Sequence, residues 1–230
     1  MLLSEKDSNM NFVTIDFSLN SPGICIFNDK SKKYHFISYI KRQGSKKSIK
    51  IQEELGLLED VTLIFQPDFE KEVDYSSVEL GKIKRYDIMS NDIINLVTQN
   101  TFKDDGYQIA FEGVSYGSSA GTNNIIDMAS AASILKIKLL KYFKPEDILT
   151  VAPATIKKHA GKGNMNKRVL WDVFTENRTG EDFLEKTNFW NFAKNLEVGK
   201  SVPKPFDDLV DAFYLNSLLR SLKTNLTSPA

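Results

Sequence analysis

The chain has 230 residues, enough for one substantial domain or at most two small ones, and its formal net charge is zero. A single cysteine and two histidines exclude an intrachain disulfide framework and argue against a Cys/His zinc site. No apolar run has the length of a membrane span and the polar start is not a signal peptide. We therefore expect a cytoplasmic protein with no membrane partner.

Charged residues are distributed in blocks along this neutral chain. Residues 30–50 carry only basic charges, residues 53–79 are acidic apart from Lys71, and residues 148–171 are again purely basic. Such blocks can form separate basic surfaces on a neutral protein. For the basic block at 30–50, ordinary solvated surfaces whose opposite charges neutralise each other are an about equally good explanation.

Three segments rich in Ile, Val, Phe and Tyr predict strands at 11–17, 22–28 and 34–40, after a flexible arm at 1–10. The short turns between these segments favour an antiparallel meander. Residues 44–80 are acidic with short apolar stretches, so we expect an insertion of mixed structure there.

The remaining chain alternates between helical and strand patterns. The predicted elements are a helix at 81–99, a strand at 107–113, a helix at 123–143, a strand at 147–151, helices at 153–160 and 165–176, a looser aromatic stretch at 181–197, and a last helix at 206–221. This order matches the ribonuclease H-like α/β fold, with a mixed five-stranded sheet (three antiparallel strands, then two parallel) flanked by helices. We expect a single domain at 11–222 and a tail at 223–230.

Four carboxylates interrupt segments that otherwise read as core. Asp16 and Glu112 end apolar strands, and Asp208 and Asp211 lie three residues apart on the apolar last helix. A carboxylate is costly to bury unless it is paired or bound to a metal. We therefore expect one shared cation site, and its oxygen ligands favour Mg²⁺ or Mn²⁺. Asp207 remains an alternative to Asp208 as a ligand.

Four segments of the sequence resemble the RuvC-like Holliday-junction resolvases. IDFSLNSPGICI resembles the first strand of that family with its small-residue turn, and IAFEGVSYG resembles the strand that carries its glutamate. VAPATIKKHAGKGNMNKRVL resembles a segment with two lysines around a Gly-x-Gly turn, and FDDLVDAFYL resembles the closing Asp-x-x-Asp-Ala helix. The segments extend from residue 13 to about 215, and residues 44–80 and 177–205 look longer than in the family.

The resemblance implies a role for each matched residue. Asp16, Glu112, Asp208 and Asp211 would be the catalytic and metal-binding carboxylates for two Mg²⁺ ions, with Mn²⁺ able to substitute. Lys167 would be the catalytic basic residue near the scissile phosphate and would stabilise the charge of that phosphate in the transition state. The candidates for DNA binding are Lys157 from the resemblance, Lys158, Lys162 and Arg168 from the basic block, and Tyr116 in place of the family's usual aromatic residue.

The implied activity is that of a crossover junction endodeoxyribonuclease, which resolves four-way DNA junctions through symmetric paired nicks. A homodimer would supply the two active sites, and the helix at 123–143 would either form its interface or pack on its own sheet. Three alternatives remain: a nuclease for flaps, forks or RNA–DNA hybrids, a non-catalytic module that binds branched DNA, and an actin-like nucleotide-binding protein, for which the chain is too short.

Overall fold

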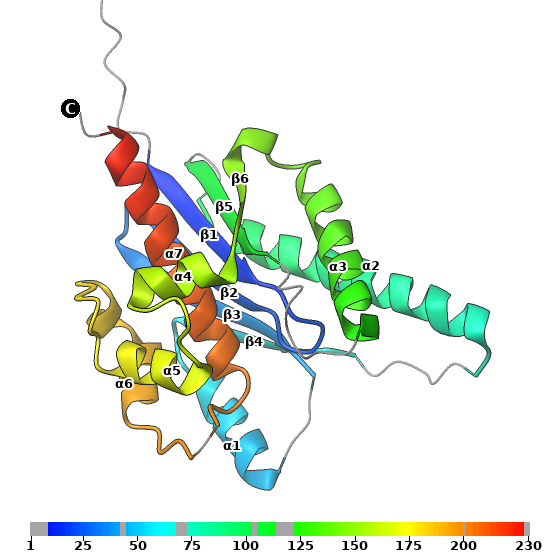
Figure 1. Ribbon diagram of the computed structural model, residues 1–230, viewed down its shortest axis with the longest axis horizontal. Helices are drawn as coiled ribbons and strands as arrows, with labels where there is room; N and C mark the ends of the chain where they lie inside the picture. Colours follow the sequence, from blue (N-terminus) through cyan, green and yellow to red (C-terminus); the bar gives the residue numbers. More distant parts are fainter. Residues whose placement is uncertain are drawn as a thin grey trace, which may run out of the picture.

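The computed structural model describes residues 9–41, 45–67, 73–102, 105–113, 122–199 and 201–227. Its centre is a six-stranded sheet with the order β4-β3-β2-β1-β5-β6 (Figure 1). The strands are β1 (Met10–Asp16), β2 (Gly23–Asn28), β3 (Lys33–Ile40), β4 (Val61–Phe65), β5 (Gly106–Glu112) and β6 (Ile148–Val151).

The pairing of five of these strands confirms the predicted ribonuclease H-like fold. β1 pairs antiparallel with β2, and β2 pairs antiparallel with β3. On its other side β1 pairs parallel with β5, which pairs parallel with β6. The sheet is thus three antiparallel strands followed by two parallel ones, with β1 in the centre.

The prediction of five strands was incomplete, because β4 adds a sixth strand at the edge, parallel to β3. β4 comes from the segment at 44–80 that was expected to be of mixed structure, as does α1 (Lys46–Leu55). The apolar run VTLIF in β4 is only five residues long and lies in an acidic stretch. A run this short does not by itself indicate a strand.

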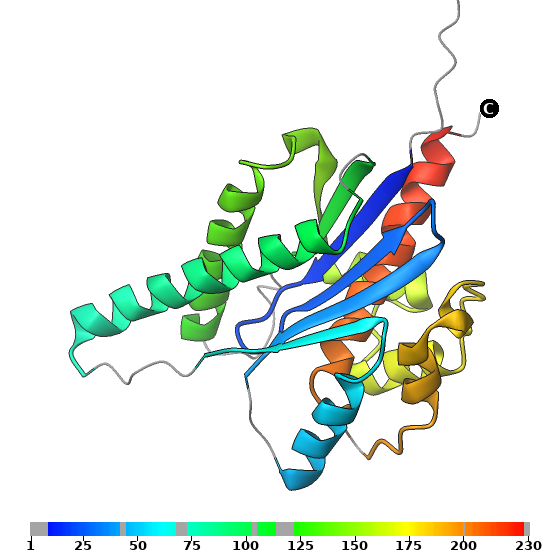
Figure 2. The same ribbon diagram turned by 180° about the vertical axis from the view of Figure 1, so that it is seen from behind.

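Helices cover both faces of the sheet. Figure 1 shows α7 crossing one face beside α4 and α5, and Figure 2 shows α2 crossing the other. Besides α1, the helices are α2 (Tyr75–Gln99), α3 (Thr122–Leu139), α4 (Pro153–Ala160), α5 (Lys167–Thr175), α6 (Asn188–Lys194) and α7 (Phe206–Thr227), with 3-10 turns at Pro145–Asp147 and Leu184–Lys186. None of the helices in the described ranges is long and apolar enough to cross a membrane.

Several boundaries differ from those expected. β1 begins at Met10, inside the predicted arm, and residues 1–8 lie outside the described part of the chain. α7 continues to Thr227, so the expected tail begins inside this helix. The aromatic stretch at 181–197 is more regular than expected, because it contains α6.

The alternation of side chains along β1 divides the core in two. Phe12 belongs to the cluster under α7, whereas Val13 and Ile15 belong to the cluster under α2 and α3. The cluster under α7 is rich in aromatic rings, and the ring of Phe174 lies 5.6 Å from that of Phe189 between α5 and α6. The aromatic side chains of α6 therefore build core rather than an exposed stacking surface.

Buried polar groups fix the position of α7 along the sheet. The Thr14 hydroxyl in β1 donates to the carbonyl of Ala212 at 2.7 Å. One turn further on, the Asn216 amide donates to the carbonyl of Phe12 at 2.8 Å and to that of Cys25 at 3.1 Å. Polar groups this deeply buried are costly to leave unpaired. A shift of α7 along the sheet would break these bonds, so the register of the helix is defined.

The first turn of α7 also lies directly against Gly23, the first residue of β2. A Cβ atom at Gly23 would lie 2.3 Å from the backbone carbonyl oxygen of Asp208. We expect Gly23→Ala to lower the free energy of unfolding by about 2–3 kcal/mol, because backbone rather than a flexible side chain would have to move. Urea denaturation measures this difference.

Gly199→Ala is the matched control, because a Cβ atom there would meet nothing within 4 Å. We expect this variant to stay within about 0.5 kcal/mol of the wild type. Equal stability of the two variants would mean that α7 does not pack on β2 this closely.

Candidate metal centre

Three of the four predicted carboxylates meet where β1 and β5 end. Because these strands are parallel, with Ile15 opposite Phe111, the next residues Asp16 and Glu112 are neighbours on the α7 face. Asp211 comes from α7, one residue before the carbonyl that Thr14 holds. One oxygen from each of the three carboxylates lies within 4.8 Å of the others.

The environment of these carboxylates disfavours three negative charges. Burial raises the pKa of Asp16, and the neighbouring charges of Glu112 and Asp211 raise it further. Burial also raises the pKa of Glu112, although a hydrogen bond with Asp16 and the charges of Lys167 and Lys157 oppose this shift. Burial raises the pKa of Asp211 to about 7. A cation between the three would remove this cost.

The donor set fits a hard divalent ion. It consists of carboxylate oxygens only, supplied by three separate elements, and Mg²⁺ and Mn²⁺ prefer such ligands. A buried oxygen nearby, Oδ1 of Asp207, also has no hydrogen-bond partner among the described residues. The acidic group of Asp16, Glu112 and Asp211 could therefore hold a metal ion.

Asp208 lies apart from this acidic group. Its side chain is buried and accepts hydrogen bonds from Ser21 and from the ammonium group of Lys204, which lies 2.6 Å from Oδ2. Asp207 accepts from Lys167 at 2.5 Å and pairs with Lys204 at 3.0 Å. Neither Asp207 nor Asp208 belongs to the group of three. Both alternatives for the fourth metal ligand are paired with lysines.

Lys167 links the two sets of carboxylates. Its ammonium group lies 3.4 Å from Asp208 and 3.6 Å from Asp211, in addition to its contact with Asp207. Burial lowers the pKa of Lys167, but the charges of these aspartates outweigh that effect and raise the pKa overall. Lys167, predicted as the basic residue of the site, is therefore a charged donor beside the acidic group.

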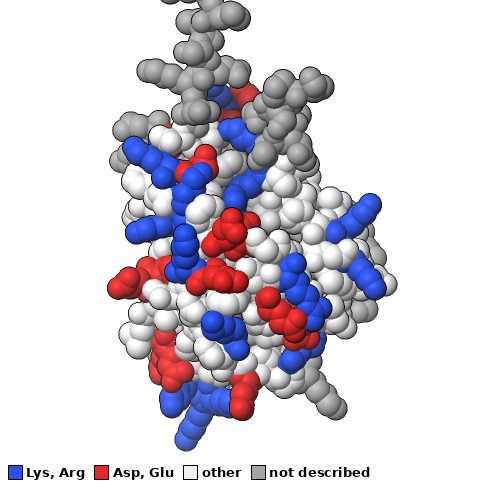
Figure 3. Space-filling view, turned by 90° about the vertical axis from the view of Figure 1, so that its left-hand side faces the viewer, with Lys and Arg blue, Asp and Glu red and all other residues white. Residues whose placement is uncertain are grey.

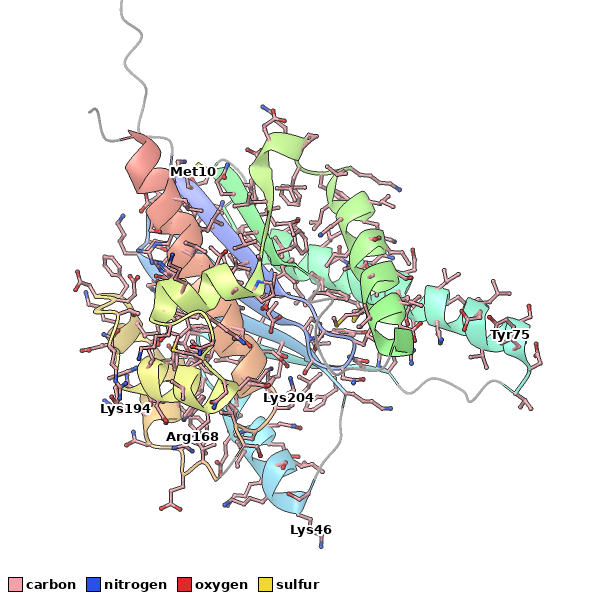
Figure 4. The ribbon with its side chains drawn as sticks, viewed as in Figure 1. Met10, Lys46, Tyr75, Arg168, Lys194 and Lys204 are labelled. Carbon is pink, nitrogen blue, oxygen red and sulfur yellow. The ribbon has the colours of Figure 1, made fainter. Side chains whose placement is uncertain are left out.

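Lys204 was missed by the sequence analysis. It lies just before α7, where Figure 4 labels it, between the predicted stretch at 181–197 and the predicted last helix at 206–221. Its spacing of three and four residues from Asp207 and Asp208 is the usual spacing of helical ion pairs. That spacing was the signal available, but it is common on protein surfaces.

The predicted DNA contacts fall into different environments. Lys158 and Lys162 are exposed, and Lys157 is half-buried on α4, close enough to lower the pKa of Glu112. Arg168 donates to the carbonyls of Val198 and Gly199 at 2.7 and 2.8 Å, so it ties α5 to the loop after α6.

Tyr116, the remaining candidate for DNA binding, lies outside the described residues. On the side of the molecule shown in Figure 3, the basic and acidic side chains that are drawn in colour are interspersed. The charge blocks of the sequence therefore do not appear there as one basic surface among the described residues.

No protein-family model matches the chain, and no curated protein matches its sequence. Among solved structures, the chain is similar to the yeast mitochondrial Holliday junction resolvase Ydc2, with 16% sequence identity and a TM-score of 0.48. The match covers 93% of this chain and 80% of that one.

The raised pKa of Asp211 predicts how the stability of the metal-free protein depends on pH. The carboxyl ionises at about 7 in the folded chain, against an ordinary value of 3.8. The folded state therefore binds more protons than the unfolded state between these values, and stability falls as the pH rises through this window. We expect Asp211→Asn to raise the free energy of unfolding by about 1–3 kcal/mol at pH 8 and by much less at pH 4.

Urea denaturation in the presence of EDTA at both pH values measures this difference. Asp182→Asn is the control, because Asp182 is exposed and the substitution should have the same small effect at both values. A gain for Asp211→Asn that is equal at pH 4 and pH 8 would show that burial of the charge is not its cause.

Proposed function

We propose that this protein is a metal-dependent endonuclease that resolves four-way DNA junctions by symmetric paired nicks. The observation that carries the proposal is the meeting of Asp16, Glu112 and Asp211, from β1, β5 and α7, within 4.8 Å beside Lys167. A non-catalytic DNA-binding module has no use for three neighbouring carboxylates whose pKa values are raised, first of all by burial.

The chemistry follows from what a phosphodiester requires. Divalent ions held by these carboxylates would activate the attacking water and stabilise the leaving oxygen. The ion would be Mg²⁺, with Mn²⁺ able to substitute. Asp16, Glu112 and Asp211 would hold one ion as they stand, and Asp208 would have to leave its lysine partners to help hold a second.

The lysines of the site have distinct parts in this proposal. Half of the Lys167 side chain is exposed (51%), so its ammonium group can reach a phosphate placed over the acidic group and stabilise the charge of the transition state. Lys157 approaches the site from the side of Glu112. The exposed Lys158 and Lys162 would contact the DNA backbone and position it without reading its sequence.

The choice of four-way junctions rests on the four sequence segments that resemble RuvC-like resolvases. The structure explains why two parts of the first segment belong together. Ser21 in the turn donates to Asp208, and Gly23 admits the backbone of the same residue. The small-residue turn is therefore part of the support of α7, and hence of the position of Asp211.

Replacement of Asp16 tests the proposed chemistry. Asp16→Asn removes a central ligand together with a charge that repels phosphate. We expect cleavage of a synthetic four-way junction in Mg²⁺ to fall by at least about 10³-fold, the scale on which loss of a key electrostatic group acts. We expect junction binding, measured in a mobility-shift assay in Ca²⁺ or EDTA, to stay equal or to strengthen.

The exposed Asp182→Asn variant is the control and should cleave as the wild type does. Near-normal cleavage by Asp16→Asn would refute the proposed site. If the wild type cleaved a flap, a fork or an RNA–DNA hybrid as fast as the four-way junction, the proposed site would stand but the proposed substrate would be wrong.

The proposal includes a homodimer, because each site can cut only one of two opposing strands. The helix α3 offers a surface for it. Ala131 and Leu135 pack into the core, whereas Ile126 and Ile137 are 58% and 61% exposed. These isoleucines are eleven residues apart and so lie on one face of the helix. The helix thus packs on its own molecule and still presents apolar side chains outward, which suits a partner subunit.

A cruciform plasmid tests the dimer. We expect light scattering at micromolar concentration to give about twice the monomer mass, and the plasmid to be linearised by paired nicks within one binding event. Ile126→Glu together with Ile137→Glu should yield monomers that release singly nicked circles. A wild-type protein that stays monomeric on the junction and releases nicked circles would contradict the resolvase proposal and favour a flap or fork nuclease.

A further inference from the structure

Both oxygens of Asp208 are already in use. The ammonium nitrogen of Lys204 lies 2.5 Å from Oδ1 and 2.6 Å from Oδ2, so one cation bridges the whole carboxylate. Oδ1 also contacts Lys167 at 3.4 Å, and Oδ2 accepts the hydroxyl of Ser21. Asp208 therefore cannot ligate a metal ion while this arrangement lasts.

Lys204 and Lys167 differ in what they hold. Lys167 contacts Asp211, which belongs to the acidic group, as well as Asp207 and Asp208. The contacts of Lys204 with carboxylates in the described chain are with Asp207 and Asp208, which lie outside that group. Departure of Lys204 would thus remove the closest cation from Asp208, with Lys167 and Ser21 still beside it, and leave the three gathered carboxylates as they are.

The surroundings of Lys204 allow it to leave. Its side chain is 47% exposed, whereas that of Asp208 is 2% exposed. An ammonium group that turns into water regains its hydration, but a buried carboxylate left with only the longer 3.4 Å contact to Lys167 keeps a desolvation cost. Removal of Lys204 therefore creates a demand for another cation at Asp208.

We propose that Lys204 is a positioning residue that acts as an exchangeable counter-ion for Asp208, so that the centre takes its divalent ions in sequence. The first ion binds to Asp16, Glu112 and Asp211 without rearrangement. The second binds only when Lys204 gives up Asp208. This inference rests on the proposed function, since it concerns the metal loading of the same site.

The same exchange links metal loading to DNA. A phosphate group of the DNA backbone offers Lys204 another anion to bind. A phosphate that binds Lys204 in place of Asp208 raises the affinity of Asp208 for a cation. By the same coupling, the second ion bound at Asp208 raises the affinity of Lys204 for the phosphate. The site would thus bind its second ion more tightly on its substrate than without it.

A Mn²⁺ titration without DNA tests this order. Free Mn²⁺ is measured by electron paramagnetic resonance in metal-free wild type and in Lys204→Met, which keeps the length of the side chain and removes its charge. We expect the wild type to bind one ion per chain, with a second at least about tenfold weaker, and Lys204→Met to tighten the second ion by about tenfold or more. Lys204→Arg keeps the charge and should behave as the wild type does.

Two further variants separate the possible causes. Lys141→Met removes one exposed positive charge just after α3 and should leave both ions unchanged, so a change there would indicate a general charge effect. Asp208→Asn should abolish the second ion and keep the first. It provides the test if Lys204→Met does not fold.

The outcomes distinguish this inference from the proposed function. Unchanged binding of the second ion in Lys204→Met, or a second ion that persists in Asp208→Asn, would overturn the role of Lys204 and leave Asp208 as a support of α7. If the wild type bound no Mn²⁺, or bound it without the help of Asp16, the proposed metal centre would be wrong, and the proposed function with it.

Discussion

The docking of α7 on β1 and β2 is the constraint on which the rest of the structure depends. The Thr14 hydroxyl and the Asn216 amide, both fully buried, fix the helix along the sheet by hydrogen bonds to backbone carbonyls. Gly23 allows the helix backbone to approach β2 at its first turn. Because Asp211 precedes the residue that Thr14 holds, this register alone places its carboxylate beside Asp16 and Glu112. The candidate metal centre is thus a consequence of how one helix is held.

The cost of gathering these carboxylates is offset by two lysines in different ways. Lys167 stabilises the charges on α7 and remains half-exposed toward the space that a substrate phosphate would enter. Lys204 neutralises Asp208, which is buried almost completely. A metal-free protein can therefore fold with five carboxylates close together, and the acidic group of three keeps the unsatisfied negative charge that attracts a divalent ion.

Much of the fold and part of the site could be predicted from the sequence. Asp16 and Glu112 end apolar strands, so their meeting follows from strand order, and Asp211 follows from the helical pattern of α7. The diversion of Asp208 could not be predicted, because it depends on the side-chain conformation of Lys204 and on a turn 187 residues away that supplies Ser21. The strand β4 was missed because pairing with β3, rather than its own short apolar run, makes it a strand. Arg168 is predicted to contact DNA from its place in a basic block, and its contacts with Asp172 and with the carbonyls of Val198 and Gly199 could not be read from that pattern.

Anomalous diffraction from crystals grown with Mn²⁺ tests the central claim most directly, namely that α7 completes a cation site with the ends of β1 and β5. The account predicts an anomalous peak within coordination distance of one oxygen each from Asp16, Glu112 and Asp211. A Mn²⁺ ion bound elsewhere, with these three carboxylates empty at saturating Mn²⁺, would contradict it.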